Sequence, residues 1–435
     1  MPPTTQDDVD QSPGSVDVHE ADLPVVEIPD SGIRRDPGGA RRARRGRRGL
    51  HRRLPKHPVA QRALVVALLL ACVPALFFVF SVVGALRTPG NYSFKAKWAD
   101  WLREHHAEYV VREFENVYFK TKQVKKGGTV TKLHALPGVE HKPSATTRAP
   151  TATLPPHIDK PKAVPLVVSP PAPGEGEWQP TGPLVKGLPG MYVSQFRADD
   201  IYTSQITSAV WIDPKLLRVR LVPGAQEPGG DWPMPHDIEG AELPKIAAAF
   251  NGGFRFQDAH GGFYLNGREA VPLVEGAASI VIHSDGKIEI GAWGRDVHMS
   301  RSVEGVLQNL TLMVDGGKID ERINHNDTAF WGSTLGGNIA VARSGVGITA
   351  DGALIYVAGP SLTAKSLAES LQRAGAVRAM TLDINPEWVT FLFYSHPDTT
   401  NPSVVKGAKL YPEIQRSEDR YLSSESRDFF TISTP

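Results

Sequence analysis

The sequence of 435 residues contains one cysteine, Cys72. A disulfide scaffold and a cysteine-based zinc site each need several thiols, so the chain is neither. Charge of one sign is not in excess either: 48 Lys and Arg balance 47 Asp and Glu, a formal net charge of +1. Nucleic-acid-binding proteins usually concentrate basic residues on their folded part. The composition therefore argues against nucleic acid as a partner.

Three common catalytic signatures are also missing from the sequence. It has no glycine-rich phosphate-binding loop ending in Lys-Ser/Thr, no Gly-x-Ser-x-Gly and no His-Glu-x-x-His. These patterns mark nucleotide hydrolases, α/β-hydrolases and zincin proteases. None of those three classes is indicated here.

The N-terminal part contains one long uncharged apolar run, residues 63–86. A helix of this length rises about 36 Å at 1.5 Å per residue, which is enough to cross a hydrocarbon core of about 30 Å. A cleavable signal peptide is the alternative, but its apolar region is usually shorter. Residues 1–62 are predicted to be a disordered tail, acidic at first and then basic. Basic residues crowd before the apolar run, which places this tail in the cytoplasm.

Three further segments are expected after the apolar run. Residues 91–120 are predicted to form a juxtamembrane helix with an aromatic face that includes Trp98 and Trp101. Residues 121–190 are rich in Pro, Thr, Ala and Lys, a composition typical of an extended linker. Residues 191–435 are predicted to be the folded domain, which is long enough for one core.

No cysteine follows Cys72, whereas a large animal ectodomain usually carries disulfides. Together with the many Arg, Ala, Pro and Gly residues, this favours a bacterial cell envelope. We therefore expect a single-pass cell-membrane protein whose N-terminus is cytoplasmic and whose C-terminal domain is extracytoplasmic.

The predicted domain consists of short apolar, β-branched runs separated by turn signals. Ser284-Asp285-Gly286 and Ala350-Asp351-Gly352 each lie between two such runs, which predicts two hairpins. A single clear helix is indicated from residue 364 to 374, with Thr363 as its N-cap and Gly375 just after its end. The predicted fold class is α+β: a mostly antiparallel sheet domain with few helices.

Polar residues lie beside glycine or at strand ends in four places: Asn251-Gly252-Gly253, Asp315-Gly316, Arg343-Ser344-Gly345 and the stretch from Asp383 to Glu387. The first two are also common turn sequences. Arg343 lies in an otherwise apolar strand and must find an anion, either a carboxylate of the protein or a phosphate or sugar acid. Asp383 and Glu387 either act as an acid–base pair, as glycoside hydrolysis requires, or serve as partners for Arg343.

Several of these segments follow one another in an order that is similar to the phosphodiester glycosidase family. The segments that carry the resemblance are Asn251-Gly252-Gly253-Phe254, Gly261 to Gly267, Ala342 to Gly347, Asp351 to Ile355, the helix at 362–371 and Ala379 to Asp383. The resemblance covers about residues 248–393 and suggests a bacterial, membrane-anchored branch of the family.

The resemblance implies a hydrolase that releases a sugar from a sugar-1-phosphodiester and leaves a phosphomonoester. In an envelope, the substrate would be a wall or surface glycan phosphodiester such as a teichoic acid. An arginine suits the anionic diester, a carboxylate suits proton transfer, and an amide suits sugar hydroxyls. The catalytic candidates are Asp383, Glu387 and Arg343, and the substrate-binding candidates are Asn251, Gly252, Gly253, Asp315 and Asn385.

One departure from the family lies just after Asp383. The family usually reads Leu-Asp-Gly-Gly-Gly-Ser there, whereas this chain has Leu382-Asp383-Ile384-Asn385-Pro386-Glu387. The glycines permit a cradle of backbone N–H groups around an anion, and proline has no N–H to offer. No cofactor is certain. The alternatives are a different substrate with Ca²⁺ or Mg²⁺ held by Asp383, Glu387 and Asp315, or a non-catalytic glycan-binding or scaffold protein.

Overall fold

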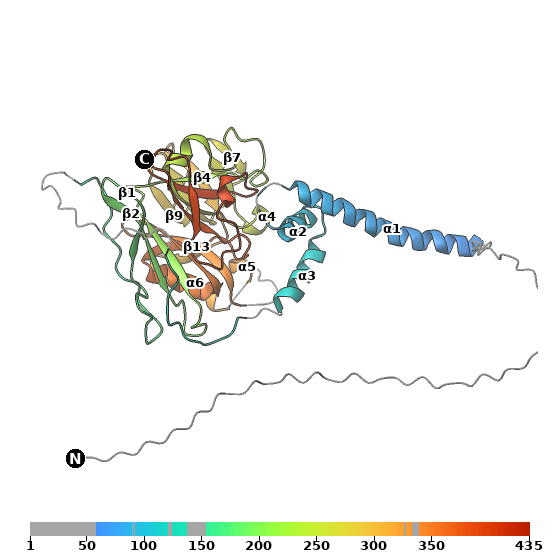
Figure 1. Ribbon diagram of the computed structural model, residues 1–435, viewed down its shortest axis with the longest axis horizontal. Coiled ribbons are helices and arrows are strands. Elements are labelled where there is room, and N and C mark those ends of the chain that lie inside the picture. The colour runs from blue at the N-terminus through green and yellow to red at the C-terminus, as the bar shows by residue number, and fades with distance from the viewer. Residues whose placement is uncertain are drawn as a thin grey trace, which may run out of the picture. The chain divides into compact units, whose positions relative to one another are not determined.

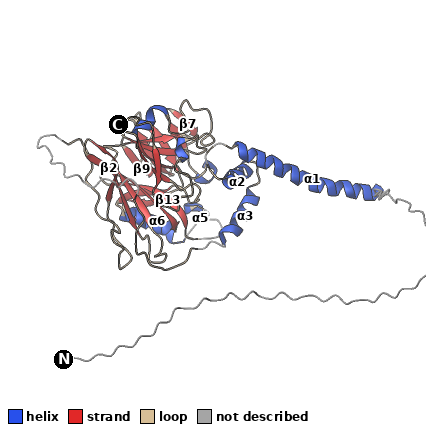
Figure 2. Ribbon diagram, in the orientation of Figure 1, coloured by secondary structure: helices blue, strands red, loops and turns tan. Residues whose placement is uncertain are grey.

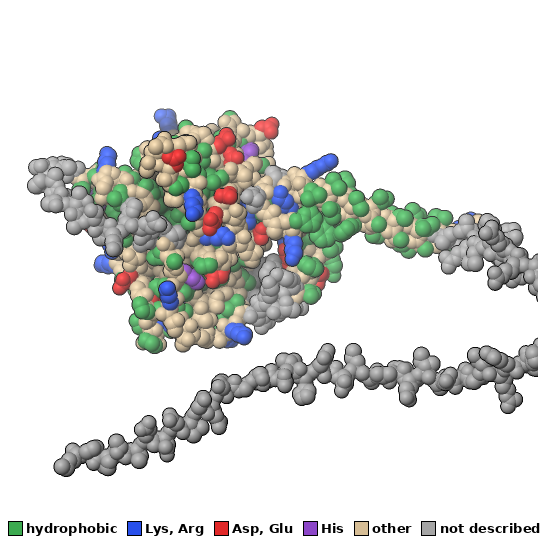
Figure 3. All heavy atoms as spheres, viewed as in Figure 1, with side chains coloured by type: hydrophobic (Ala, Val, Ile, Leu, Met, Phe, Trp, Pro, Cys, Tyr) green, Lys and Arg blue, Asp and Glu red, His purple; other side chains and the backbone are tan. Residues whose placement is uncertain are grey.

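The computed structural model describes residues 58–88, 90, 92–120, 124–136, 154–325, 328–332 and 339–435 (Figure 1). The tail predicted up to residue 62 lies outside these ranges except for its last five residues. Helix α1 (Pro58–Arg87) contains the predicted apolar run. Within the described residues, one helix, Gln61–Arg87, is long and apolar enough to cross a membrane. Its large apolar side chains are mostly exposed, and Figure 3 shows them along the helix surface.

The juxtamembrane helix expected over 91–120 is divided into two helices, α2 (Phe94–Glu104) and α3 (Glu108–Lys120). The break falls at His106, whose φ of 59° lies in the left-handed region that ends a helix. Trp101 packs with Ala85 of α1 in a small apolar cluster. The predicted aromatic face thus packs against the end of α1, and this packing positions α2.

Strands form three sheets in the part of the chain that follows residue 178 (Figure 2). The first sheet has the order β1 (Gln179–Val185), β2 (Leu188–Phe196), β3 (Thr207–Ile212), β14 (Leu354–Leu362), β13 (Val341–Thr349), β15 (Ala376–Thr381), β11 (Leu312–Asp315), β12 (Lys318–Ile319). The second has the order β7 (Arg268–Val271), β6 (Phe263–Leu265), β10 (Val303–Gln308), β8 (Ala278–His283), β9 (Ile288–Ala292). The third has the order β17 (Lys406–Lys409), β16 (Phe391–Ser395), β5 (Ile246–Asn251), β18 (Phe429–Ser433), β4 (Arg218–Val222).

Neighbouring strands pair in the antiparallel sense in all three sheets, which confirms the predicted α+β class. Both predicted hairpins form: Gly286 turns β8 into β9 and Gly352 turns β13 into β14, each with positive φ. The remaining short elements are α4 (Phe256–Ala259), α5 (Thr328–Trp331), η1 (Gly240–Lys245), η2 (Glu321–His325) and η4 (Arg420–Leu422).

Helix α6 (Ala364–Arg373) confirms the predicted helix, and it packs against β13, β14 and β15 (Figure 1). Thr363 is its N-cap: its Oγ1 accepts from the N–H of Ser366, whose Oγ accepts from the N–H of Thr363. Gly375 follows the helix with a φ of 108°. Capping residues and apolar spacing were both visible in the sequence, which is why this element was predictable.

The boundary predicted at residue 191 is too late, and the linker expected over 121–190 is correspondingly shorter. Strands β1 and β2 both begin before it, and Ile158, Val164 and Trp178 are buried in the core. Their apolar side chains are widely spaced among prolines, so the Pro-rich composition concealed a segment that packs on the domain. Residues 137–153 of the predicted linker lie outside the described residues.

Two strand registers bring distant segments together. Residue 345 pairs with 381 between β13 and β15, and the N–H of Ser344 donates to the carbonyl of Asp383 at 2.8 Å. Between β5 and β18, Asn251 pairs with Phe429. The ends of β5, β15 and β18 therefore present Asn251, Asp383 and Asp428 to one region.

Candidate functional site

Asn251 joins three segments of the domain. Its Nδ2 donates to the carbonyl of Gly252 at 2.8 Å and to Ser344 Oγ at 3.1 Å. Its Oδ1 accepts from the Tyr356 hydroxyl at 2.9 Å and from the N–H of Thr390 at 3.0 Å. Because both ends of the amide are bonded within the protein, its geometry is that of a residue that positions its neighbours.

Arg343 does not face Asp383, although their backbones lie side by side. Its side chain is fully buried, and it donates from Nε to the carbonyl of Leu362 at 2.9 Å and from Nη1 to that of Trp331 at 3.3 Å. Burial lowers the pKa of Arg343 to about 10. Side chains alternate between the two faces of a strand, so the next residue, Ser344, is the one that points toward Asp383. The sequence-based grouping of Arg343 with Asp383 is therefore wrong: the Arg343 side chain lies on the opposite face of β13, and Ser344 contacts Asp383 instead.

Asp383 has a buried carboxyl at the end of β15. Its Oδ1 accepts from the N–H of Asn385 at 2.8 Å, and its Oδ2 lies 3.4 Å from Nη1 of Arg427. Burial raises the pKa of Asp383 to about 6, and the positive charge of Arg427 limits the rise. Asp383 is therefore mostly ionised at neutral pH and can accept a proton.

A second buried carboxyl belongs to Asp428, which directly precedes β18. Burial, together with the nearby carboxyl of Glu227, raises the pKa of Asp428 to about 8, whereas Arg427 opposes the rise. Its Oδ2 has no hydrogen-bond partner within the described part of the chain. Gly252 donates its N–H to the carbonyl of Asp428 at 3.2 Å, and a hydrogen bond from the N–H of Gly253 stabilises the ionised form. Asp428 therefore holds a proton at neutral pH that it can donate.

Arg427 borders both of these acids, and Arg255 and Arg427 both interact with the nearby carboxyl of Glu227. Both are more than nine-tenths buried, and in neither does Nε have a hydrogen-bond partner among the described residues. The guanidinium carbon of Arg427 lies 3.8 Å from the centre of the Trp388 ring. Guanidinium groups with an unpaired N–H are suited to bind an anion such as phosphate.

Asp315 does not belong to this cluster. It pairs with Arg295 and Arg378, and β11 runs antiparallel to β15, with Val314 opposite Ala379. Asp383 lies at the other end of β15, about 13 Å further along at 3.3 Å per residue. The antiparallel register thus separates Asp315 from Asp383, which the sequence had suggested as members of one site.

Asn385 and Glu387 form a turn that follows Asp383. Asn385 Oδ1 accepts from the N–H of Glu387 at 2.9 Å, and Glu387 Oε1 accepts at 3.4 Å from both the N–H and the hydroxyl of Ser93. In this turn the backbone N–H groups of Asn385 and Glu387 therefore donate to side chains of the protein. The glycines of the family's motif are replaced by Pro386, which has no N–H, and by residues whose N–H groups are already bonded. No group of three or more His, Cys, Asp or Glu that could hold a metal gathers anywhere in the described ranges, so the suggested Ca²⁺ or Mg²⁺ set is not assembled.

Sequence reasoning missed Arg427, Asp428 and Glu227. The dipeptide Arg427-Asp428 directly precedes the apolar run Phe429–Ser433, so it had the same strand-end signal that drew attention to Asp383. Glu227 lies in a loop after β4 with no such signal. Its pKa is raised chiefly by burial, which only the folded chain creates.

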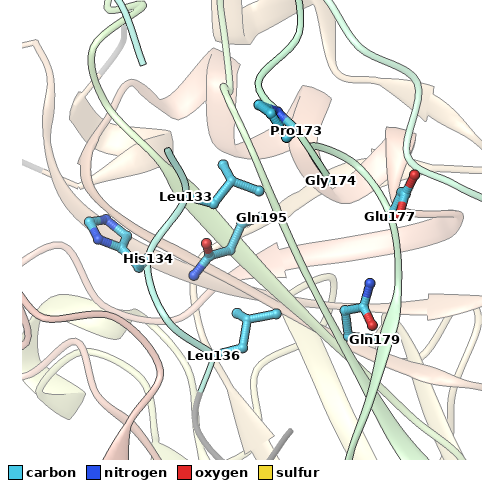
Figure 4. A pocket seen from close by; sticks show the side chains of 8 residues that line it. All are labelled: Leu133, His134, Leu136, Pro173, Gly174, Glu177, Gln179 and Gln195. Carbon is cyan, nitrogen blue, oxygen red and sulfur yellow. The ribbon is translucent and has the colours of Figure 1, made fainter. Parts of the chain in front are cut away.

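A cavity of about 310 Å³ lies elsewhere, lined by Leu133, His134, Leu136, Pro173, Gly174, Glu177, Gln179 and Gln195 (Figure 4). The amide of Gln195 is buried and has no hydrogen-bond partner in the described part of the chain. The cavity shares no lining residue with the acid and arginine cluster. Its position therefore does not change the assignment of the candidate site.

Residues 244–383 match the model of the phosphodiester glycosidase family. Among solved structures, the chain is similar to the zebrafish N-acetylglucosamine-1-phosphodiester alpha-N-acetylglucosaminidase catalytic domain, auto-inhibited by its pro-peptide: 15% identity over 56% of this chain and 82% of that one, TM-score 0.38. A hypothetical protein from Synechocystis matches with 12% identity over 59% of this chain and 64% of that one, TM-score 0.37. No curated protein matches the sequence.

Proposed function

We propose that this protein hydrolyses a glycosyl phosphodiester, a function suggested by the match of residues 244–383 to the phosphodiester glycosidase family model. Water adds across the bond between the anomeric carbon and the phosphate oxygen, giving the free sugar and a phosphomonoester. The observation that carries the proposal is the pair of buried carboxyls, Asp383 and Asp428, whose pKa values of about 6 and about 8 are set apart by their surroundings. Two acids poised in this way are the usual requirement of glycoside hydrolysis.

The pKa values assign the roles. Asp428 is protonated at neutral pH and donates its proton to the departing phosphate oxygen. Asp383 is ionised, and it activates the water or attacks the anomeric carbon directly. Arg427 interacts electrostatically with both acids and binds the phosphate as its charge develops.

The test is hydrolysis of a synthetic sugar-1-phosphodiester by the full chain in detergent. The rate is measured as the amount of reducing sugar released with time. Asp383→Asn and Asp428→Asn should each lower kcat/KM by about a hundredfold or more. Asp315→Asn is the matched control, because Asp315 pairs with Arg295 and Arg378 at the other end of β15, and it should leave the rate unchanged. Equal rates in all four proteins would refute the proposal.

We also propose that α1 anchors the protein in a bacterial cell membrane and that the C-terminal domain acts on an envelope polymer outside the cytoplasm. The length and apolar surface of α1 and the basic residues before it support this topology. Protease treatment of intact spheroplasts should degrade a C-terminal epitope tag and spare an N-terminal one. The reverse pattern, or a soluble cleaved product, would contradict it.

A second candidate function is glycan binding without turnover. It is favoured by the turn after Asp383, in which Asn385 and Glu387 donate backbone N–H groups to side chains within the turn, leaving no glycine cradle for an anion. Binding of wall polysaccharide with no released sugar would support this function. Detection of released sugar would exclude it.

A further inference from the structure

Helix α2 places a carboxylate between the two arginines of the candidate site. Asp100 is 1% exposed, and its Oδ1 lies 2.9 Å from Nη2 of Arg255 and 4.0 Å from Nη2 of Arg427. We infer that Arg255 and Arg427 form the subsite for the phosphate of the substrate and that Asp100 occupies this subsite in the closed state. The inference rests on the proposed function for the identity of the anion.

Helix α2 supplies most of the ion pairs of the two arginines. Both ion-pair partners of Arg255 among the described residues, Asp100 and Glu104, belong to that helix. Arg427 keeps Asp383 as its other partner. A buried guanidinium without a counter-charge is strongly unfavourable. When α2 moves away, Arg255 therefore loses both of these ion pairs and Arg427 loses one of two, and a phosphate diester has the geometry that arginine binds best.

The residues just before α2 cover the neighbouring aromatic surface. The rings of Tyr92 and Trp388 lie 5.2 Å apart between centres, and the N–H and hydroxyl of Ser93 donate to Glu387. Trp388 is 3% exposed, and Arg416, Arg420 and Arg427 also lie against its ring. The segment 92–104 thus sets a ring against Trp388 and a carboxylate between the arginines. A sugar phosphate likewise consists of a ring joined to an anion, so it resembles the pair formed by the Tyr92 ring and the Asp100 carboxylate.

The cover is also joined to the predicted anchor. Trp98 Nε1 donates to Ser81 Oγ of α1 at 2.9 Å, and the ring of Trp101 lies so close to Gly84 that a β-carbon there would be 1.9 Å from it. Movement of α2 off the site therefore requires it to shift against the end of α1 or to carry that end with it. Access to the site is in this way coupled to the apolar helix.

Phosphate binding tests the subsite without any need for turnover. Inorganic phosphate is titrated into the full chain in detergent by calorimetry, using wild type, Asp100→Ala and Asp100→Ala with Arg255→Ala. Asp100→Ala should bind phosphate at least about tenfold more tightly than wild type, since one neutralised charge contact is worth that much. The second substitution should abolish the gain. Glu304→Gln is the control: Glu304 pairs with Arg218 and contacts neither Asp100 nor the two arginines, so phosphate affinity should not change.

Asp100→Asn keeps the size of the side chain and removes its charge, so it answers the same question if the alanine variant does not fold. Equal phosphate affinity in wild type and in the folded Asp100 variant would overturn the inference, as would a gain that survives removal of Arg255. If the gain appears as expected but no variant releases sugar, the subsite stands and the proposed hydrolysis fails. If wild type hydrolyses the diester but Asp100 variants bind phosphate no better than wild type, the proposed hydrolysis stands and the phosphate subsite is refuted.

Discussion

A β-carbon at Gly252 would lie 1.8 Å from Oδ2 of Asp428, so the glycine leaves room for the buried carboxyl. Nonbonded contacts of a β-carbon are essentially never shorter than 3.0 Å. Gly252→Ala should therefore push the Asp428 carboxyl out of place and lower kcat/KM by about a hundredfold. Gly267→Ala changes a turn glycine that has open space beside it but also a φ of 87°, so it should cost a little stability and no activity. Full activity in Gly252→Ala would show that Asp428 does not act from this position.

The activity should depend on pH through both acids. Asp383 must be ionised and has a pKa of about 6, and Asp428 must be protonated and has a pKa of about 8. A plot of kcat/KM against pH should therefore be bell-shaped, rising through pH 6 and falling through pH 8. Steady-state rates between about pH 5 and pH 9 measure this profile. A rate that is flat across both limbs would contradict the assigned roles.

The raised pKa of Asp428 also predicts a loss of stability as pH rises. The folded protein keeps the proton up to about pH 8, whereas a free aspartic acid side chain has a pKa of 3.8. Between these values the folded state binds more protons than the unfolded state, so the free energy of unfolding falls by at most about 1.4 kcal/mol per pH unit. Asp428→Asn should flatten this dependence in thermal unfolding up to about pH 8. Asp383→Asn should flatten it only up to about pH 6.

A buried ionic network holds the loop that carries Trp388. Glu425 Oε2 accepts from Nη2 of Arg416 at 2.8 Å and from Nε of Arg420 at 2.7 Å, and Arg420 also donates to the carbonyl of Trp388. Glu425→Gln leaves two buried guanidiniums without a counter-charge and should cost about 3–5 kcal/mol. Glu304→Gln, which breaks the half-exposed pair with Arg218, should cost about 1 kcal/mol or less. Thermal unfolding of both variants measures the difference, and equal melting temperatures would contradict this prediction.

Local signals in the sequence were sufficient for much of the fold. The capping pair at Thr363 and the apolar spacing after it determine α6, and the Asp-Gly turns at 285–286 and 351–352 determine two hairpins. The strand-end position of Asp383 and its proximity to Asn251 also followed from the order of the segments. The helix, the two hairpins and the strand-end position of Asp383 depend on residues that are near one another in the chain, whereas the proximity of Asp383 to Asn251 was implied by the family resemblance.

Local pattern did not show which face of a strand a residue takes or which strand ends meet. Arg343 was predicted to supply the guanidinium of the site. Because side chains alternate between the two faces of a strand, Arg343 points into the core and Ser344 contacts Asp383. Asp315 looked like a neighbour of Asp383, yet the antiparallel register puts it at the far end of β15. Face and register are decided by packing against partners that are distant in sequence.

The sequence by itself determined the apolar helix, the class of fold and the family segment, because spacing, turn chemistry and ordered motifs are properties of short stretches. Only the tertiary structure brought Arg427 and Asp428, which directly precede the C-terminal strand, against Asp383 and Gly252, and set Asp100 of α2 between two arginines. Burial in that shared interior is what separates the pKa values of the two acids, and burial arises only when all of these segments pack together.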